Sequence, residues 1–121
     1  MREIKFKAQR ADGKGWVIGF YVFTSNKYHQ ILTGKWSNTS GSHYAYEIDP
    51  DTLCQFTGLQ DKNGVDIYEG DVDENDWIVE WNEKLACFIG VDFDAEIWYF
   101  LHDLQDQLDG FVIKSNIHVN P

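Results

Sequence analysis

Carboxylate and amide side chains in one acidic loop have the spacing that begins a calcium-binding loop. Asp71, Asp73 and Asn75 stand at alternate positions, and their hard oxygen atoms would suit Ca²⁺. Such a loop requires glycine at its sixth position and a bidentate glutamate at its twelfth, but this chain has Asp76 and Asn82 there. An EF-hand is therefore disfavoured, and loose binding of a divalent ion by the acidic loop stays open as an alternative.

Two other sets of residues carry groups that could bind metal or act as nucleophiles. His102, Asp106 and Asp109 would share one face if their segment were helical, but no second histidine stands at a similar spacing, so a solvated face is preferred. Cys54 and Cys87 are the only cysteines of the chain. Their number and separation predict two free, partly buried thiols rather than a disulfide framework.

The sequence lacks the common catalytic motifs. It has no glycine-rich phosphate loop, no Gly-x-Ser-x-Gly elbow and no Cys-x-x-Cys pair. We therefore predict no catalytic residue, no metal ligand and no cofactor. Twenty carboxylates leave a carboxylate-dependent hydrolase as an alternative, because the two acids of such a site are defined by their distance in space.

The elements that would position these residues are mostly short strands. The segment 4–8 alternates apolar and basic residues, which indicates a half-exposed strand. The segment 16–23 is continuously apolar, so we expect a strand that is buried on both faces or lies in an interface, with Gly19 marking a bulge. In the segment 77–81, Trp77, Val79 and Trp81 share one face, a stripe more typical of a core or a subunit interface than of a ligand platform.

The C-terminal third predicts a hairpin, a short helix and a last strand. Segments 87–93 and 97–100 form the arms of the hairpin, and Tyr99 to Leu108 is the single helical candidate. Together, these patterns predict an all-β fold, a small antiparallel barrel of the SH3-like kind with additional strands and at most one short helix. With 121 residues we expect a single domain, residues 1–121, and the polar loop 37–42 makes a division near residues 37–50 the alternative.

The most specific pattern lies between Gln55 and Val72 and combines two turns with two short apolar strands. Asn63-Gly64 predicts a two-residue type I′ hairpin turn, because both residues tolerate a positive φ. Glu69-Gly70-Asp71 predicts a second tight turn.

This pattern resembles the signature of the YopX family, small proteins of phages and prophages of Gram-positive bacteria. Similar motifs extend over most of the chain, from Arg2-Glu3-Ile4-Lys5-Phe6-Lys7-Ala8 to Asn116-Ile117-His118-Val119-Asn120-Pro121. The resemblance implies a phage or prophage origin, a β fold and self-association, and it supplies no catalytic residues. The signature residues have structural explanations: backbone geometry for Gly58, Asn63, Gly64 and Gly70, core packing for Leu59 and Ile67, a half-buried ring for Tyr68, and capping of turn N–H groups for Asp61 and Asp71.

Charge is distributed unevenly along the chain. Residues 1–35 carry seven basic and two acidic groups, a net charge of +5, whereas residues 36–121 carry a net charge of −15. Compensation between neighbouring strands, a head-to-tail contact between copies and an acidic face for a basic partner are all compatible with this asymmetry. Direct nucleic-acid binding is disfavoured in a strongly acidic chain. No segment is apolar enough to span a bilayer or to serve as a signal peptide, so we expect a cytoplasmic protein.

The aromatic excess and the charge asymmetry favour a phage accessory protein that binds itself or a host or phage protein, in which case we expect a homo-oligomer. The candidate binding surface is Tyr68, Glu69, Trp77 and Trp81. An acidic mimic of nucleic acid that inhibits a host protein and a carboxylate-dependent hydrolase are the alternatives.

Overall fold

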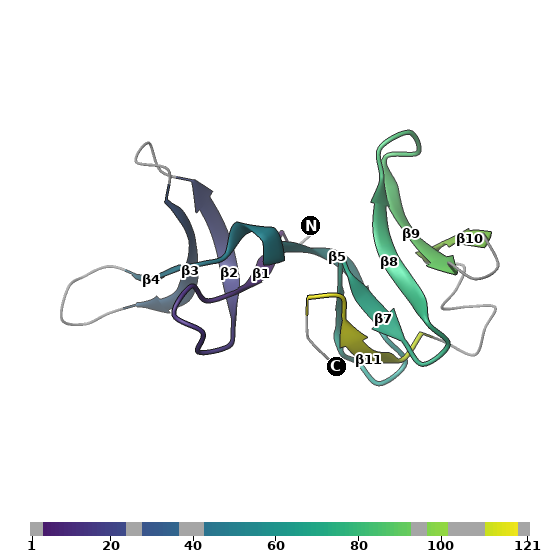
Figure 1. Cartoon of the computed structure of the whole chain (residues 1–121), viewed down its shortest axis with the longest axis horizontal. Coiled ribbons are helices and arrows are strands. Elements are labelled where there is room, and N and C mark those ends of the chain that lie inside the picture. The colour runs from purple at the N-terminus through teal and green to yellow at the C-terminus, as the bar shows by residue number, and fades with distance from the viewer. Residues whose placement is uncertain (1–3, 24–27, 37–42, 93–96, 102–110, 119–121) are drawn as a thin grey trace. The chain divides into compact units, whose positions relative to one another are not determined.

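The computed structural model describes residues 4–23, 28–36, 43–92, 97–101 and 111–118. Within these ranges the chain forms antiparallel strands and one 3-10 helix, η1 (Pro50–Thr52), which confirms the predicted all-β fold class (Figure 1). The strands are β1 (Phe6–Gln9), β2 (Trp16–Phe23), β3 (His29–Trp36), β4 (His43–Glu47), β5 (Cys54–Gln60), β6 (Asp66–Tyr68), β7 (Asp71–Asp73), β8 (Trp77–Asn82), β9 (Cys87–Asp92), β10 (Ile97–Phe100) and β11 (Ile113–Asn116).

The chain divides into two compact units, Met1–Gln55 and Phe56–Pro121, here called the N-terminal and C-terminal units. Strand β5 begins in the first unit and ends in the second. The predicted polar loop 37–42 lies outside the described residues, and the expectation of a single domain stays a prediction.

The N-terminal unit is a sheet in the order β4-β3-β2-β1, with the first residues of β5 beside β1. Its core lies on one face of the sheet, where alternation along the strands brings apolar side chains together. The buried residues of this core are Ala8, Val17, Ile31 and Ile48.

Strand β2 differs from its predicted burial. Val17 is buried, but Ile18 and Phe20 are 52% and 61% exposed, so burial of both faces within this chain is wrong and the interface alternative stays a prediction. The predicted bulge at Gly19 is also wrong, because β1 and β2 pair there without a shift of register. The glycine is required because a Cβ at this position would lie 2.1 Å from the carbonyl oxygen of Leu32.

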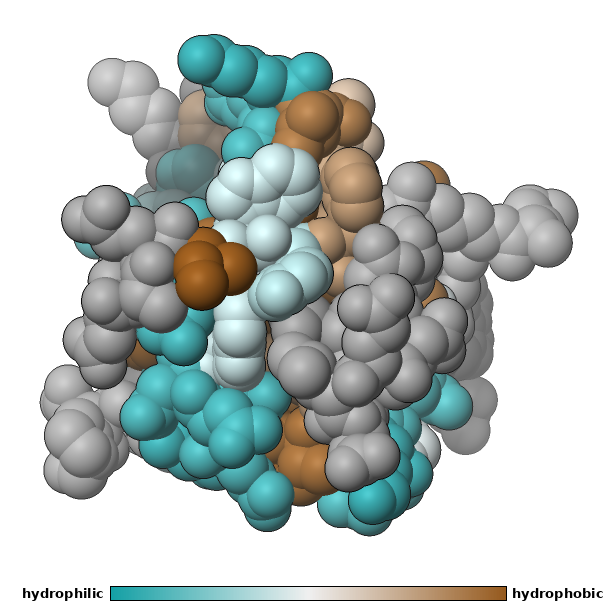
Figure 2. All heavy atoms as spheres, turned by 90° about the vertical axis from the view of Figure 1, so that its right-hand side faces the viewer, coloured by the Kyte–Doolittle hydropathy of each residue, from teal (hydrophilic) through white to brown (hydrophobic). Residues whose placement is uncertain are grey.

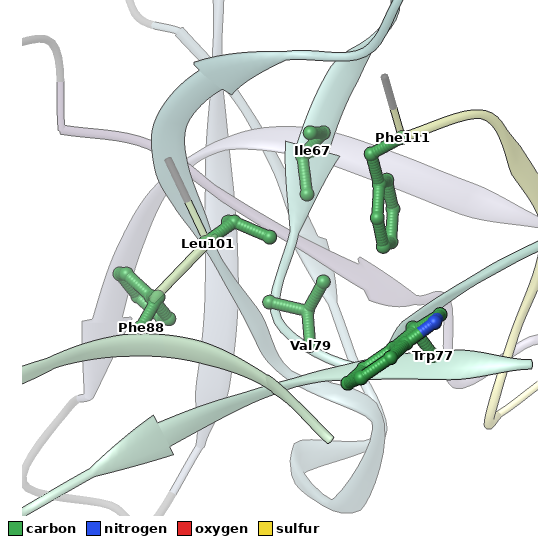
Figure 3. Close-up of a cluster of buried hydrophobic side chains, with 6 residues drawn as sticks. All are labelled: Ile67, Trp77, Val79, Phe88, Leu101 and Phe111. Carbon is green, nitrogen blue, oxygen red and sulfur yellow. The ribbon is translucent and has the colours of Figure 1, made fainter. Parts of the chain in front are cut away.

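The C-terminal unit contains a sheet in the order β10-β9-β8-β7-β11, and strand β6 pairs with β5. One hydrophobic cluster fills this unit (Figure 3), and its buried members are Ile67, Trp77, Val79, Phe88, Leu101 and Phe111. Among the described strands neither sheet order closes on itself, so the SH3-like detail stays a prediction.

The predicted hairpin of residues 87–93 and 97–100 is confirmed by the antiparallel pairing of β9 with β10. The start of the predicted helix is wrong, because Tyr99 and Phe100 pair with Gly90 and Ile89 as part of β10. The strand therefore includes the first two residues of the predicted helix, and Leu101, the next residue, is helical. Residues 102–108 of that predicted helix lie outside the described residues, as do His102, Asp106 and Asp109.

Candidate functional site

The turn after β5 is built around the carboxylate of Asp61. Its Oδ1 atom accepts hydrogen bonds from the backbone N–H groups of Asn63 and Val65, each at 2.9 Å. The Gly64 N–H donates to the Asp61 carbonyl, and Gly64 alone among the turn residues has a positive φ, of 81°. The predicted two-residue type I′ turn is therefore wrong: a type I turn followed by a left-handed glycine forms instead, and the Asp61 side chain stabilises this longer loop.

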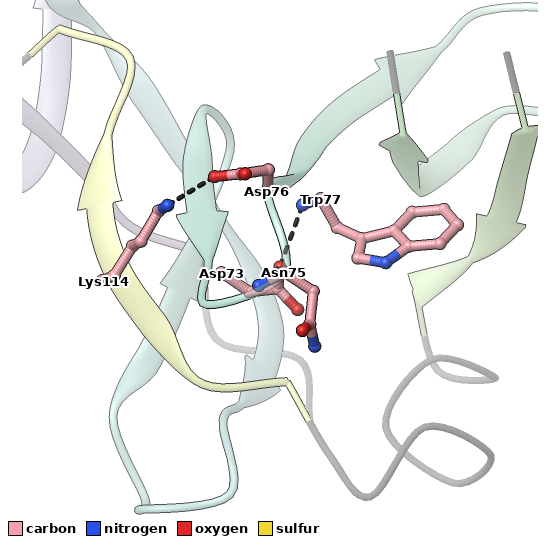
Figure 4. Close-up of polar contacts among 5 residues, drawn as sticks. All are labelled: Asp73, Asn75, Asp76, Trp77 and Lys114. Carbon is pink, nitrogen blue, oxygen red and sulfur yellow. Dashed lines mark hydrogen bonds and ion pairs between the residues drawn. The ribbon is translucent and has the colours of Figure 1, made fainter. Parts of the chain in front are cut away.

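The turn between β7 and β8 repeats this arrangement (Figure 4). The Asp73 Oδ1 atom accepts hydrogen bonds from the N–H groups of Asn75 and Trp77, each at 2.9 Å. Asp76 occupies the position of the left-handed glycine with a φ of 65°, and its carboxylate forms an ion pair with Lys114. The sequence Asp-Glu-Asn-Asp-Trp thus folds as Asp-Lys-Asn-Gly-Val does twelve residues earlier.

Burial raises the pKa of Asp73 above its ordinary value, and the Trp77 and Asn75 N–H donors partly offset this effect. The nearby Asp76 carboxylate also raises the pKa, whereas Lys114 lowers it. The Asp73 side chain is only 4% exposed, which explains why desolvation dominates.

Asp71 is the most deeply buried carboxylate of the signature, at 1% exposure. Its Oδ2 atom accepts from the Tyr68 N–H at 2.8 Å, and its Oδ1 atom accepts from the Asn116 side-chain amide at 2.9 Å. The Asn116 Oδ1 atom in turn accepts from the His118 N–H. The carboxylate therefore joins the start of the signature turn to the end of β11.

These contacts give the carboxylates of the suggested calcium loop a structural role. Asp71 and Asp73 direct oxygen atoms at hydrogen-bond donors of the protein itself. Among the described residues, no three histidine, cysteine, aspartate or glutamate side chains are grouped closely enough to hold a metal ion. Cys54 is buried and Cys87 half-buried, and no disulfide joins them, as predicted.

The four residues of the candidate binding surface do not share one environment. Tyr68 and Trp77 are buried at 3% and 9% exposure, where their rings contact Phe56 and Tyr99. Glu69 is half-buried. Trp81 is 42% exposed and packs edge-on against the ring of Phe88. Trp81 and Glu69 are therefore the members of this set with area exposed to solvent.

Strands β8, β9 and β10 carry a second apolar surface, on the side of the sheet opposite the hydrophobic cluster. Alternation along β8 turns Trp77 and Val79 inward, so the residues between them face outward. Two rows cross the three strands on this outer face, which we call the β8–β10 face: Ile78, Val91 and Trp98 in one row, and Glu80, Ile89 and Phe100 in the other.

The β8–β10 face is partly open to solvent. Trp98 and Phe100 are 46% and 36% exposed, and their rings meet edge to face. Ile78 and Val91 are half-buried beside them. Figure 2 views the molecule from the side on which β10 lies in Figure 1, and side chains of intermediate and high hydropathy reach the surface there beside hydrophilic ones. Sequence reasoning missed this face; the signal was the uninterrupted run Ile97-Trp98-Tyr99-Phe100.

Strand β10 is also the edge strand of its sheet. All four of its residues, Ile97 to Phe100, are exposed. A short edge strand without charged residues is a template on which another strand or surface can pack. The candidate functional site of this chain is therefore the β8–β10 face together with the edge that β10 forms.

The electrostatic setting of this site is acidic. The C-terminal unit contains three basic and fifteen acidic residues, a net charge of −12, whereas the N-terminal unit has seven basic and five acidic residues, a net charge of +2. In the part of the chain that the structure describes, no helix has the length and apolar composition needed to cross a membrane.

Comparison with family models finds a match to the family described as YopX protein, over residues 5–121. The match covers nearly the whole chain and includes both units. Comparison with curated proteins and comparison with solved structures each find no match.

Proposed function

The chain belongs to the YopX family, and from that premise we propose that it is a phage or prophage accessory protein that acts by binding protein rather than by catalysis. It works in the cytoplasm of the host cell. Its binding surface is the β8–β10 face, and Trp98 is the main contact residue.

The observation that carries this proposal is the two-sided apolar character of β8, β9 and β10. An antiparallel sheet that packs a core on one face normally presents polar residues on the other. Here Trp98 extends the half-buried row of Ile78 and Val91 into solvent. Phe100 is the exposed end of the second row, beside the buried Ile89. Exposed aromatic residues next to aliphatic ones are typical of the centres of protein interfaces.

The roles of the acidic residues also support binding over hydrolysis. Asp61, Asp71 and Asp73 are the buried carboxylates of the described residues, and each accepts backbone hydrogen bonds in a turn. Side chains used in this way organise the fold on which the β8–β10 face is presented.

A matched pair of surface variants tests this proposal. Trp98→Ser removes the central ring of the face, and Val65→Ser removes an apolar side chain of the same unit that is 52% exposed in the Asp61 turn. We expect Trp98→Ser to weaken self-association or capture of a host protein by at least about 30-fold, the effect of a typical hot-spot tryptophan, while Val65→Ser changes it little. Equal binding by Trp98→Ser and the wild type, with both folded by circular dichroism, would overturn the proposal.

A second candidate function rests on the net charge of −12 in the C-terminal unit. A protein that carries this density of carboxylates fits the basic cleft of a DNA-binding protein, as an acidic mimic of nucleic acid. Competition separates the two functions: duplex DNA should displace the partner of a mimic, whereas a partner held by the β8–β10 face should stay bound.

A further inference from the structure

The N-terminal unit carries a second unpartnered apolar surface, on the side of its sheet opposite the core. Alternation along β2 places Val17 and Tyr21 toward the core and turns Ile18 and Phe20 outward. Strand pairing adds neighbours from β1 and β3 to this outward set, because Lys7 stands opposite Ile18 and Leu32 opposite Phe20. We call this set the β2 face: Lys7, Trp16, Ile18, Phe20, Val22 and Leu32.

The β2 face is both apolar and positively charged. Ile18 and Phe20 are its most exposed members, at 52% and 61%. The Lys7 ammonium lies 4.9 Å from the centre of the Trp16 ring, which holds a positive charge against an aromatic surface. Lys7 lies beside the apolar centre of this face, and Glu47 lies at its margin on β4, opposite Gln30, which stands opposite Val22.

The β8–β10 face has the same construction with the opposite sign. Glu80 is its one charged member and stands in the row with Ile89 and Phe100. The units that carry the two faces have net charges of +2 and −12. Each face therefore combines aromatic and aliphatic contact area with a charge of opposite sign to that of the other face, Lys7 on one and Glu80 on the other.

We propose that the occupant of the β8–β10 face is a second copy of this chain, which docks through its β2 face. This inference rests on the proposed protein-binding function and names the partner. The contact is heterologous: it joins different faces of the two copies, so each copy keeps one unused face and assembly either continues or closes into a ring.

Charge favours this pairing over contact between like faces. Two β8–β10 faces brought together would place two units of net charge −12 and two Glu80 side chains next to each other. Like-charge juxtaposition opposes association, whereas the acidic face and the Lys7 face attract. Salt consequently has opposite effects on the two arrangements: it weakens the heterologous contact and strengthens a contact between acidic units.

Mixing two variants tests the proposal. Phe20→Ser removes the β2 face and keeps the β8–β10 face, and Trp98→Ser does the reverse. By sedimentation velocity we expect each variant alone to be monomeric, and an equimolar mixture to form a one-to-one dimer that does not grow. Tyr44→Ser, at an exposed site outside the β2 face, is the control and should assemble as the wild type does.

The other outcomes separate this inference from the proposed function. If Phe20→Ser self-associates alone and Trp98→Ser does not, the contact joins two β8–β10 faces: the inference fails and the function stands. If Trp98→Ser self-associates alone, the β8–β10 face is not needed for self-association. The inference then fails, and so does the proposed role of this face in self-association. A wild type that stays monomeric, or a mixture without the dimer, overturns the inference, and loss of host-protein capture by Trp98→Ser would still support the function. The expected loss in association constant is at least about 30-fold for Trp98→Ser, as above, and at least about tenfold for Phe20→Ser.

Discussion

Replacing two buried aspartates by asparagine should have opposite consequences, because the two carboxylates use their oxygen atoms differently. Asp71 accepts hydrogen bonds on both oxygen atoms, from the Tyr68 N–H and the Asn116 amide. Asp73 accepts the hydrogen bonds from the Asn75 and Trp77 N–H groups on the same oxygen atom, Oδ1. An asparagine side chain has one accepting oxygen, so it can replace Asp73 but not Asp71.

Asp71→Asn leaves one buried donor facing an NH₂ group. The Asn116 amide cannot turn over to accept, because its oxygen already accepts from the His118 N–H. A buried donor without an acceptor costs about 1 to 3 kcal/mol, with the upper part of that range expected for a partner that was charged. At a urea dependence of about 1 to 3 kcal/mol per molar, the unfolding midpoint should fall by about 1 M.

Asp73→Asn keeps both hydrogen bonds and removes a charge that burial disfavours. The pKa of Asp73 is higher in the folded chain than in the unfolded chain, so protonation favours folding. This contribution to stability is complete below the unfolded pKa of about 3.9 and is lost as the pH rises through the folded pKa. Asparagine is neutral at every pH, so Asp73→Asn does not lose this stability when the wild-type carboxyl ionises. The unfolding free energy of Asp73→Asn minus that of the wild type should therefore rise from pH 4 to pH 7.

Urea unfolding followed by tryptophan fluorescence measures both effects, and unchanged slopes would show that the comparison is sound. Asp71→Asn with a wild-type midpoint at pH 7 would refute the account of its two acceptors. An Asp73→Asn variant that loses stability relative to the wild type as the pH rises would refute the account of Asp73.

Three further substitutions, and a control for one of them, test the described fold by urea unfolding. Asp76→Gly should raise the unfolding free energy by about 1 kcal/mol, because it relieves a left-handed backbone at the loss of only an exposed ion pair; a loss of stability would contradict this. Gly19→Ala should destabilise the N-terminal unit by about 3 kcal/mol or prevent its folding, since the new Cβ meets the Leu32 carbonyl, whereas Gly13→Ala, in an open turn, should cost about 1 kcal/mol. Leu101→Ala should cost about 2 to 5 kcal/mol as the loss of a fully buried side chain, and a cost below 1 kcal/mol would place Leu101 outside the core.

The strands of this protein could be predicted because their signals are local. Alternation and turn residues are read within a few positions, and they locate the hairpin of β9 and β10 as well as the strand around Val79. The turn at Asn63-Gly64 shows where local reading fails. The pair alone predicts a two-residue turn, but the Asp61 side chain selects a longer one by capping its N–H groups.

The turn-capping role of Asp73 could also have been predicted from the sequence, but the comparison with a calcium loop drew attention to metal binding instead. The order Asp-x-Asn followed by a left-handed residue occurs at Asp61 and again at Asp73. Once the first turn is known, the second follows from it, with Asp76 in place of Gly64.

The β8–β10 face could not be found in the same way. Whether Trp98 faces the core or the solvent depends on the register of β10 with β9, and a shift of one residue would exchange Trp98 with Tyr99. The burial of Tyr68 and Trp77 likewise depends on contacts with Phe56 and Tyr99, which are distant in the chain. The orientation of Trp98 and the burial of Tyr68 and Trp77 depend on how the strands pair, which cannot be predicted from composition.

Sedimentation velocity of the wild type and of Trp98→Ser, at about 0.1 M and about 1 M salt, tests most directly whether the β8–β10 face binds protein. The Debye length is about 10 Å at the lower salt and about 3 Å at the higher. We predict that the wild type associates at low salt and dissociates at high salt, and that Trp98→Ser is monomeric at both. Association of Trp98→Ser equal to that of the wild type would contradict the proposed role of this face.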